Sequence, residues 1–182
     1  MAQIVMRVVS GRFRGTRLDA VSGDKTRPTT DKVKEAMFSM LTPYLNGGEV
    51  LDLYAGTGGL SIEAVSRGMA HATLVDRQFQ AIKVIQNNIE KTHDIAAFTV
   101  IKSPAKQALE KFALARQQFD LVFLDPPYAK ETLRGDMRYM AENQLLAPQA
   151  IILVESDDDA NLPQEDQNFM IIQQKHYGIT VV

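Results

Sequence analysis

Four consecutive residues, Asp125, Pro126, Pro127 and Tyr128, place a carboxylate, two proline carbonyls and an aromatic ring next to one another. Because proline has no N–H and a fixed φ, this stretch of backbone offers acceptors and few donors. Such acceptors can take both hydrogens of an exocyclic amine on a nucleobase while the ring of Tyr128 stacks on the base. Holding the amine in this way favours the tetrahedral transition state of group transfer to its nitrogen. We therefore expect these four residues to be catalytic; the alternative is a rigid proline turn after a strand.

A glycine-rich loop offers a second site. It follows the apolar run at 49–54 and contains Ala55, Gly56, Thr57, Gly58 and Gly59. Glycines allow a sharp turn and let backbone N–H groups approach a ligand at the start of the next helix. A P-loop would need Gly-Lys-Ser/Thr, but this chain has Gly59-Leu60-Ser61, which disfavours hydrolysis of nucleoside triphosphates. A dinucleotide-binding loop would need a third glycine where Ser61 stands, so that match is partial.

Two carboxylates near this loop favour one cofactor class. Asp52 stands four residues before Gly56, at the end of the same apolar run. It would repel a pyrophosphate but attract S-adenosylmethionine, which carries an ammonium and a sulfonium group and no phosphate. Asp76, 24 residues after Asp52, follows the next apolar run, where a carboxylate can accept both hydroxyls of a ribose. The alternative for Asp76 is an N-cap of the helix expected to begin near Phe79.

The elements that must position these residues alternate regularly. Apolar runs typical of buried strands lie at 49–54, 72–76, 98–101, 119–124 and 151–155, and helical periods lie between them at 60–67, 79–91, 105–115 and 131–142. This alternation predicts an α/β fold with a doubly wound, mostly parallel sheet, whose ligands bind at the carboxyl ends of its strands. Two further strands, at 169–177 and 178–182, have no room for a helix between them. They should pair antiparallel at the sheet edge, which makes seven strands.

The N-terminal part breaks this rhythm. Residues 5–9 and 16–18 predict a small β-hairpin, and residues 30–45 predict a helix. We therefore divide the chain into an N-terminal extension, residues 1–46, and a Rossmann-like catalytic domain, residues 47–182.

Charge is divided between the two ends of the chain in a similar way. Residues 1–38 hold eight Lys or Arg and four Asp or Glu, a net charge of +4, whereas the other 144 residues carry −6. A basic end on an acidic body indicates a surface for a polyanion; the alternative is a solvated, cation-rich hairpin.

Composition excludes several function classes. With 182 residues, of which 45% are hydrophobic and 23% charged, the chain fits one globular domain with a small addition. It has no cysteine, which excludes disulfides, thiolate nucleophiles and iron–sulfur clusters, and its three histidines are scattered, so we expect no metal. No apolar stretch reaches the roughly 20 residues needed to cross a bilayer, and the N-terminus resembles no signal peptide, so we expect a cytoplasmic protein.

Four motifs, taken in order, resemble the bacterial RsmD family. They are Arg7-Val-Val-Ser-Gly-Arg12-x-Arg14-Gly15, Arg27-Pro-Thr-Thr-Asp-Lys-Val-Lys-Glu35-Ala-Met-Phe38, Leu51-Asp-Leu-Tyr-Ala-Gly-Thr-Gly-Gly-Leu60 and His176-Tyr177-Gly178. The glycine loop combined with Asp125-Pro-Pro-Tyr128 also resembles the class I S-adenosylmethionine-dependent methyltransferases that modify exocyclic amines. The resemblance covers nearly the whole chain. It implies a Rossmann-like enzyme that transfers a methyl group from S-adenosylmethionine to the N2 amine of a guanine in 16S ribosomal RNA.

The resemblance also implies roles for individual residues. S-adenosylmethionine would be held by Asp52, Tyr54, Ala55, Gly56, Thr57, Gly58, Gly59, Asp76 and Arg77, and its adenine would lie near Ser103, Pro104 and Ala105, where many relatives carry an acid. Arg7, Arg12, Arg14, Arg17 and Arg27 would bind RNA phosphates. The family pattern has Arg-x-Arg-Glu where this chain has Lys32-Val33-Lys34-Glu35, which keeps the charge that attracts phosphate but loses the bidentate geometry. The partner would be 16S ribosomal RNA or an assembly intermediate of the small ribosomal subunit, bound by a monomer without a metal.

Three alternatives stay open. An adenine-N6 DNA methyltransferase would use the same four residues at 125–128, but it requires a target-recognition domain, for which 182 residues leave little space. A nicotinamide-dependent oxidoreductase is favoured only by the Gly-x-Gly loop at 56–58. A non-catalytic RNA-binding module is disfavoured because both the loop and the residues at 125–128 are present.

Overall fold

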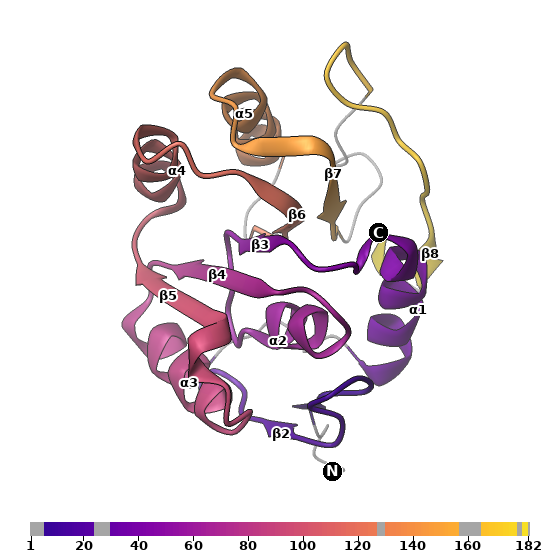
Figure 1. Cartoon of the computed structure of the whole chain (residues 1–182), viewed down its shortest axis with the longest axis vertical. Helices are drawn as coiled ribbons and strands as arrows, with labels where there is room; N and C mark the ends of the chain where they lie inside the picture. Colours follow the sequence, from indigo (N-terminus) through magenta and orange to yellow (C-terminus); the bar gives the residue numbers. More distant parts are fainter. Residues whose placement is uncertain (1–5, 24–29, 127–129, 157–164, 178–179, 182) are drawn as a thin grey trace.

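Five parallel strands form the central sheet of the computed structural model, which describes residues 6–23, 30–126, 130–156, 165–177 and 180–181. The strands are β3 (Glu49–Asp52), β4 (His71–Asp76), β5 (Phe98–Lys102), β6 (Phe119–Leu124) and β7 (Leu146–Val154). Their spatial order is β5-β4-β3-β6-β7 (Figure 1). A helix lies on each connection between consecutive strands of this sheet, as parallel pairing requires. The predicted doubly wound α/β fold is confirmed.

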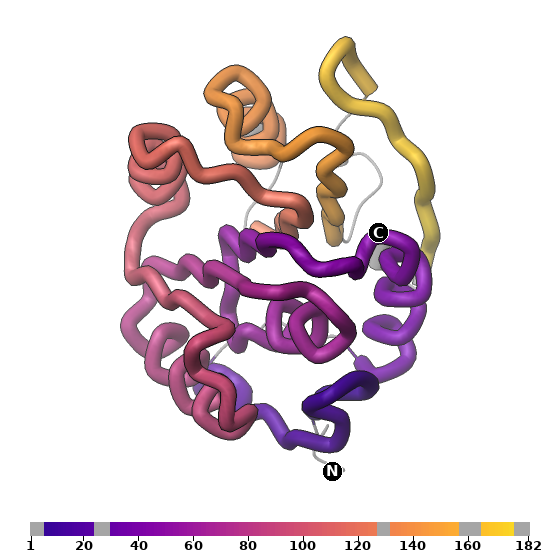
Figure 2. Tube along the Cα trace, in the orientation of Figure 1, coloured from indigo at the N-terminus to yellow at the C-terminus, as the bar shows by residue number. Residues whose placement is uncertain are grey.

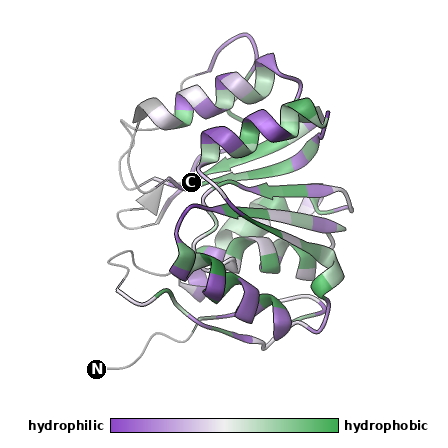
Figure 3. Cartoon of the chain, turned by 90° about the vertical axis from the view of Figure 1, so that its left-hand side faces the viewer, coloured by the Kyte–Doolittle hydropathy of each residue, from purple (hydrophilic) through white to green (hydrophobic). Residues whose placement is uncertain are grey.

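Helices cover both faces of this sheet (Figure 2). One face is covered by α1 (Asp31–Leu41), α2 (Gly59–Ser66) and α3 (Phe79–Glu90), and the other by α4 (Ala105–Leu114) and α5 (Lys130–Glu142); short 3-10 helices lie at Thr42–Tyr44 and Ile95–Ala97. Side chains alternate along β6, so that Leu121 and Phe123 pack with α1, α2 and α3, whereas Val122 and Leu124 pack with α4 and α5. The sheet is therefore apolar on both faces, as the green band between the helices in Figure 3 shows. Within the described ranges, no helix combines the length and apolar character needed to cross a lipid bilayer.

The predicted N-terminal hairpin packs against α2. Its strands β1 (Met6–Arg7) and β2 (Arg17–Leu18) pair antiparallel. Gly11 has φ +88°, and a Cβ at this position would lie 2.0 Å from the carbonyl oxygen of Ser66, so the close approach to α2 requires glycine. The hydroxyl oxygen of Ser66 accepts the Phe13 N–H at 2.9 Å. Val8, Phe13 and Leu18 are buried in the same core as α1, α2 and α3, so the hairpin shares its core with the sheet.

The two C-terminal strands pair antiparallel, as predicted, and bring the strands after the hairpin to seven. They are β8 (His176–Tyr177) and β9 (Thr180–Val181), which within the described residues form a sheet of their own instead of an edge of the parallel sheet. Strand β8 is also shorter than the predicted 169–177. Carboxylates just before it take up backbone N–H groups that an edge strand would donate: Asp166 accepts from Phe169 at 3.1 Å and Glu165 from Ile171 at 2.8 Å. These local bonds compete with strand pairing.

Candidate active site

The order of the strands places the site between β3 and β6. From β3 the chain moves outward through β4 and β5, then returns to the other side of β3 as β6. Ligands of doubly wound sheets bind at this reversal, outside the carboxyl ends of the strands. Asp52 is paired with Phe123 across the two strands, so Asp125 follows β6 at the same edge. The structure thus brings together the two carboxylates that the sequence places at strand ends.

Asp52 is a buried carboxylate without a charge partner in the described part of the chain. Its side chain accepts the hydroxyl of Ser61, on α2, at 2.8 Å, and the residue is 3% exposed. Burial is the main cause that raises the pKa of Asp52 to about 7; the Ser61 bond opposes this shift, and the charges of Asp125 and Asp76 contribute to it. A cation placed here would stabilise the ionised form of Asp52, as expected for a ligand with ammonium and sulfonium groups.

The glycine loop turns sharply between β3 and α2. Gly56 and Gly58 both have left-handed φ angles, +57° and +80°. A Cβ at Gly58 would lie 3.0 Å from Leu74 Cδ2, so this glycine packs tightly on β4. Gly56 instead has no atom within 4 Å of the place where a Cβ would be. The loop is therefore closed toward the protein at Gly58 and open at Gly56, where a ligand has room to approach the backbone.

Neighbouring elements hold the loop in place. The Ala55 N–H donates to Val75 O at 2.9 Å, and Gly59 N–H donates to the hydroxyl oxygen of Thr57 at 3.2 Å. The carbonyl of Thr57 accepts the side-chain amide of Asn88 at 2.9 Å, and Asn88, from α3, is fully buried. Sequence reasoning missed Asn88, which has no motif around it.

Asp76 contacts both the loop and the next helix. One carboxylate oxygen accepts the N–H of Gly56 at 3.0 Å, and the other accepts the N–H of Gln78 at 2.8 Å. The N-cap of α3 is Gln78 and no side chain caps this helix, so the alternative prediction that Asp76 is its N-cap is wrong. Since each carboxylate oxygen can accept more than one hydrogen bond, the ribose role predicted for Asp76 is compatible with both contacts. The neighbouring Arg77 is exposed.

The predicted adenine region lies beside Asp76. Its segment follows β5, and the Ser103 N–H donates to Asp76 O at 3.0 Å. Ser103 is buried, and its hydroxyl donates to Pro104 O at 2.9 Å, while Ala105 begins α4. The hydroxyl of Ser103 is thus already used within the protein, and an adenine contact there stays a prediction.

Tyr54 connects the site to α5. Its hydroxyl donates a short hydrogen bond to the carboxylate of Asp136. Burial raises the pKa of Tyr54, and burial also raises the pKa of Asp136 against the effect of this bond. Tyr54 is predicted to bind the cofactor, but its hydroxyl connects the segment after β3 to α5. Sequence reasoning missed Asp136.

Asp125 has a carboxylate neighbour, Glu155, that the sequence analysis did not consider. Leu124 and Val154 are paired across β6 and β7, and the Glu155 N–H donates to Leu124 O at 3.2 Å. Asp125 is exposed and Pro126 is partly buried, whereas Pro127 and Tyr128 lie outside the described residues. Burial and the charge of Asp125 raise the pKa of Glu155 to about 7. The signal was available, because Glu155 ends its apolar run as Asp52 and Asp76 end theirs.

Known proteins that are similar to this chain show its family. A family model described as "Conserved hypothetical protein 95" matches residues 6–182. The chain belongs to this family, the RsmD family. YlbH of Bacillus subtilis, to which an rRNA methyltransferase activity is provisionally assigned, is 41% identical over 177 residues, which are 97% of this chain and 96% of YlbH. Ribosomal RNA small subunit methyltransferase D of Escherichia coli K12 is 32% identical over 173 residues, 95% of this chain and 85% of the relative. The solved structure of Escherichia coli YhhF is 31% identical with a TM-score of 0.81, covering 97% of this chain and 94% of that one.

The basic residues expected to bind RNA in an RsmD-family protein differ in how available they are. Arg7 pairs with Asp31 at 2.9 Å, and Arg12 pairs with Asp94 at 2.5 Å. Arg14 and Arg17 are exposed and make no ion pair with any described residue. Arg27 lies outside the described residues. The structure therefore favours Arg14 and Arg17 as the phosphate contacts of the hairpin.

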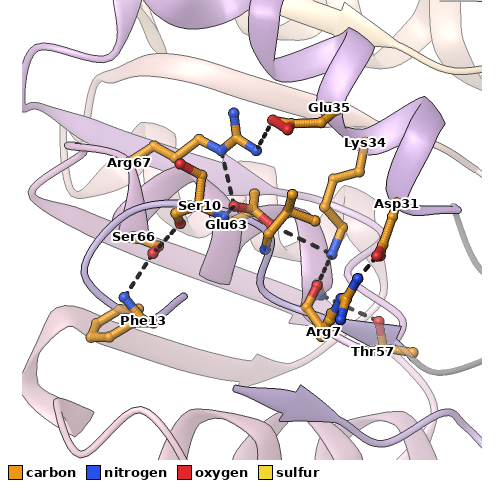
Figure 4. Close-up of polar contacts among 12 residues, drawn as sticks. Arg7, Ser10, Phe13, Asp31, Lys34, Glu35, Thr57, Glu63, Ser66 and Arg67 are labelled. Atoms are coloured by element: carbon orange, nitrogen blue, oxygen red, sulfur yellow. Dashed lines mark hydrogen bonds and ion pairs between the residues drawn. The ribbon is translucent and has the colours of Figure 1, made fainter. Parts of the chain in front are cut away.

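Lys34 and Glu35, in the segment where the RsmD family has Arg-x-Arg-Glu, belong to a charge cluster whose centre is buried (Figure 4), whereas Lys32 is exposed. We define the Lys34 cluster as Lys34, Glu35, Glu63 and Arg67. Lys34 is 4% exposed, and its ammonium donates to Arg7 O at 2.9 Å and lies 3.6 Å from the carboxylate of Glu63. Burial lowers the pKa of Lys34. The expectation that Lys34 attracts phosphate is wrong, because its charge is enclosed between α1, α2 and the hairpin.

Glu63 is the centre of this cluster. Its carboxylate is fully buried and accepts the N–H groups of Val9 and Ser10 at 2.8 and 3.1 Å. It also accepts Arg67 Nε at 2.9 Å, and Arg67 in turn reaches Glu35 at 2.8 Å. The Lys34 cluster thus ties the hairpin and α1 to α2, the helix that begins at the glycine loop.

Proposed function

We propose that this protein transfers a methyl group from S-adenosylmethionine to the exocyclic N2 amine of a guanine in 16S ribosomal RNA. The observation that carries the proposal is the meeting of Asp125 with Asp52 and the glycine loop at the point where the strand order reverses. Membership of the RsmD family supports the choice of ribosomal RNA, since the Escherichia coli relative is named for the small-subunit RNA.

The residues around Asp52 fit S-adenosylmethionine. The buried carboxylate of Asp52 would face the positive charges of the cofactor. The open space at Gly56 would let the cofactor approach the backbone of the loop. Asp76 would accept its ribose hydroxyls, with Arg77 and the segment 103–105 nearby. When bound, this cofactor supplies a methyl group on a positively charged sulfur.

The residues after β6 would hold the target amine. The Asp125 carboxylate and the Pro126 carbonyl would accept its two hydrogens, with Pro127 completing the turn and Tyr128 stacking on the base. A conjugated amine is a weak nucleophile, and accepting its hydrogens moves it toward tetrahedral geometry. The guanine must leave its stack to reach these residues.

The basic hairpin would bind the RNA around the target. Arg14 and Arg17, with Arg27, would contact phosphates, while the acidic remainder of the chain would contain the active site. The N-terminal extension, residues 1–46, would then serve RNA binding, and residues 47–182 would serve catalysis. We further propose that the protein acts as a cytoplasmic monomer without a metal.

Replacing Asp125 with alanine tests this assignment. We expect Asp125→Ala to lower turnover about 10²–10⁴-fold, because the amine loses its charged acceptor, while binding of S-adenosylhomocysteine in calorimetry stays close to that of the wild type. Asp120→Ala is a matched control, since it removes a carboxylate from the other end of β6, where Asp120 accepts the Glu49 N–H. Full turnover by Asp125→Ala would overturn the assignment.

The substrate is tested in cells. Mass mapping of small-subunit RNA from a strain lacking the gene should reveal one lost methylguanine, restored by the wild-type gene but not by the Asp125→Ala gene. Loss of a methyladenine from DNA instead would favour an adenine-N6 DNA methyltransferase. Binding of NAD but not of S-adenosylhomocysteine would favour an oxidoreductase.

A further inference from the structure

Glu155 and Asp125 form a carboxyl pair at the ends of adjacent parallel strands. We infer that Glu155 is a positioning residue that acts together with Asp125: the two adjacent carboxyls form one proton-accepting pair, which takes up the proton released by the methylated amine. The inference deepens the proposed function and rests on the proposed role of Asp125.

The backbone fixes the two residues beside each other. Leu124 and Val154 are partners in the β6–β7 ladder, and Asp125 and Glu155 are the next residue on each strand. The Glu155 N–H donates to Leu124 O at 3.2 Å, which extends the ladder to Glu155 itself. Because parallel strands of a sheet run in register here, both side chains start from the same edge of the sheet.

Burial differs between the two carboxyls. Asp125 is exposed, whereas Glu155 is partly buried and its Oε2 atom is buried without a hydrogen-bond partner in the described part of the chain. An ionised oxygen so placed is costly, while a protonated carboxyl is tolerated. Glu155 is thus the member of the pair that retains a proton longest, and Asp125 is the member that can meet the substrate.

Other charges near the pair act in the same direction. Among the described residues, Asp125 acts on Glu155, and Asp125 and Asp76 both act on Asp52. These interactions join carboxylates at the ends of β3, β4, β6 and β7. Crowding of negative charge raises the proton affinity of the pair, in agreement with the pKa of about 7 for Glu155.

A proton acceptor with this affinity suits the reaction. After methylation, one N–H bond of the amine breaks, its electron pair stays on nitrogen, and the proton binds to the carboxyl pair. The pair loses one negative charge and later returns the proton to water through the exposed Asp125. A base works best when its pKa lies near the working pH, and an isolated Asp, with a pKa of about 3.9, is a weak acceptor at neutral pH.

The pH dependence of kcat, with S-adenosylmethionine and RNA saturating, tests the inference. In the wild type, kcat should rise with pH around a midpoint of about 7, and we call this rise the limb of the pH profile. In Glu155→Gln this limb should move down by more than one pH unit, because the carboxyl that titrates at about 7 has been removed, and kcat at pH 8 should fall about 10–100-fold. Glu155→Asp should restore the limb near neutrality. A purely structural role would lower kcat without moving the limb.

Controls separate this inference from other causes. Glu49→Gln removes a carboxylate at the amino end of β3 and should leave the limb in place. Protonation of Asp52 affects the affinity for the cofactor. When the cofactor is saturating, this effect does not contribute to the pH dependence of kcat. If Asp125→Ala is inactive but Glu155→Gln keeps the wild-type limb, the inference is wrong and the proposed function stands. If Asp125→Ala keeps full turnover, the proposed function fails as well.

Discussion

Two groups of charged side chains in this molecule are arranged in opposite ways. In the Lys34 cluster, each carboxylate has a cation: Glu63 lies between Lys34 and Arg67, and Arg67 also reaches Glu35. We call Asp52, Asp76, Asp125 and Glu155 the site carboxylates; there, the charges that act on one another have the same sign. The Lys34 cluster is electrostatically complete within the chain. Under the proposed function, the positive charge of S-adenosylmethionine would offset this repulsion.

The surroundings of the buried carboxylates differ in the same way. Burial alone raises the pKa of a carboxyl, and it does so for Asp52 and Glu155, which titrate at about 7. Glu63 is buried at least as deeply as Asp52, yet two cations and two backbone N–H groups surround it. Glu63 and Asp52 are therefore similar in burial depth but differ in the sign of the charges around them.

The largest effect should follow from opening the Lys34 cluster. Glu63→Ala leaves the buried ammonium of Lys34 without its counter-ion and removes the acceptor of the Val9 and Ser10 N–H groups. We expect the free energy of unfolding in urea to fall by about 3–5 kcal/mol. Glu63→Gln, which keeps an acceptor for one N–H group, should cost less.

Glu35→Ala is the matched control for this change. Glu35 pairs with the same Arg67, but its side chain is 50% exposed. An exposed ion pair contributes about 0–1 kcal/mol, so Glu35→Ala should change the unfolding free energy by no more than that. Equal losses for Glu63→Ala and Glu35→Ala would show that burial does not govern the cluster.

A site carboxylate should respond in the opposite way. Asp52→Asn removes a buried charge that has no cation partner in the described part of the chain. We expect the ligand-free protein to be as stable as the wild type or more stable at pH 8. Affinity for S-adenosylmethionine, measured by calorimetry, should fall by about 1.5–3 kcal/mol, the typical contribution of a hydrogen bond to a charged group. A clear loss of stability with unchanged affinity would place Asp52 in the same class as Glu63.

The pH dependence of stability gives the same comparison without a ligand. The pKa of folded Asp52 is about 7, above its ordinary value of 3.8, so between these values the folded protein binds more protons than the unfolded chain. The stabilisation is complete below the ordinary value and is lost as the pH rises toward 7. For Asp52 the slope is at most about 1.4 kcal/mol per pH unit. Asp52→Asn should remove the contribution of Asp52 to this slope. The contribution of Glu155, whose pKa is also raised, should remain.

The sequence predicted which carboxylates lie together at the strand ends, but it did not predict the contacts of the charged residues in the surrounding helices. Asp52, Asp76 and Asp125 each end an apolar run, and the carboxyl ends of parallel strands meet at one edge, so their proximity followed from the pattern alone. Glu155 obeys the same rule and could have been found with it. Lys34 was assigned to phosphate by its charge, although its spacing from Met37, Phe38 and Leu41 places it on the buried stripe of α1.

Other features depend on contacts that no local pattern records. The apolar residues 169–172 predicted a strand, but nearby carboxylates bind their N–H groups. The partners of Arg7 and Arg12 come from 24 and 82 residues away in the chain, so the sequence could not show which cations of the hairpin are already neutralised.

The smallest effect should come from the exposed cations of the hairpin, and it concerns salt dependence. Each phosphate contact contributes about 0.7–0.9 to the slope of log affinity against log salt concentration. Arg14→Ala should lower the slope for RNA binding by about this amount, because Arg14 has no ion pair with a described residue, whereas Arg12→Ala should change it less, because Asp94 neutralises Arg12. Asp94→Ala is a further test, because it removes the ion-pair partner of Arg12. It should steepen the dependence of RNA affinity on salt concentration in a filter-binding titration. If Arg12→Ala and Arg14→Ala flatten the slope equally, RNA displaces Asp94 from Arg12, and the ion pair is an exchangeable contact unlike those of the Lys34 cluster.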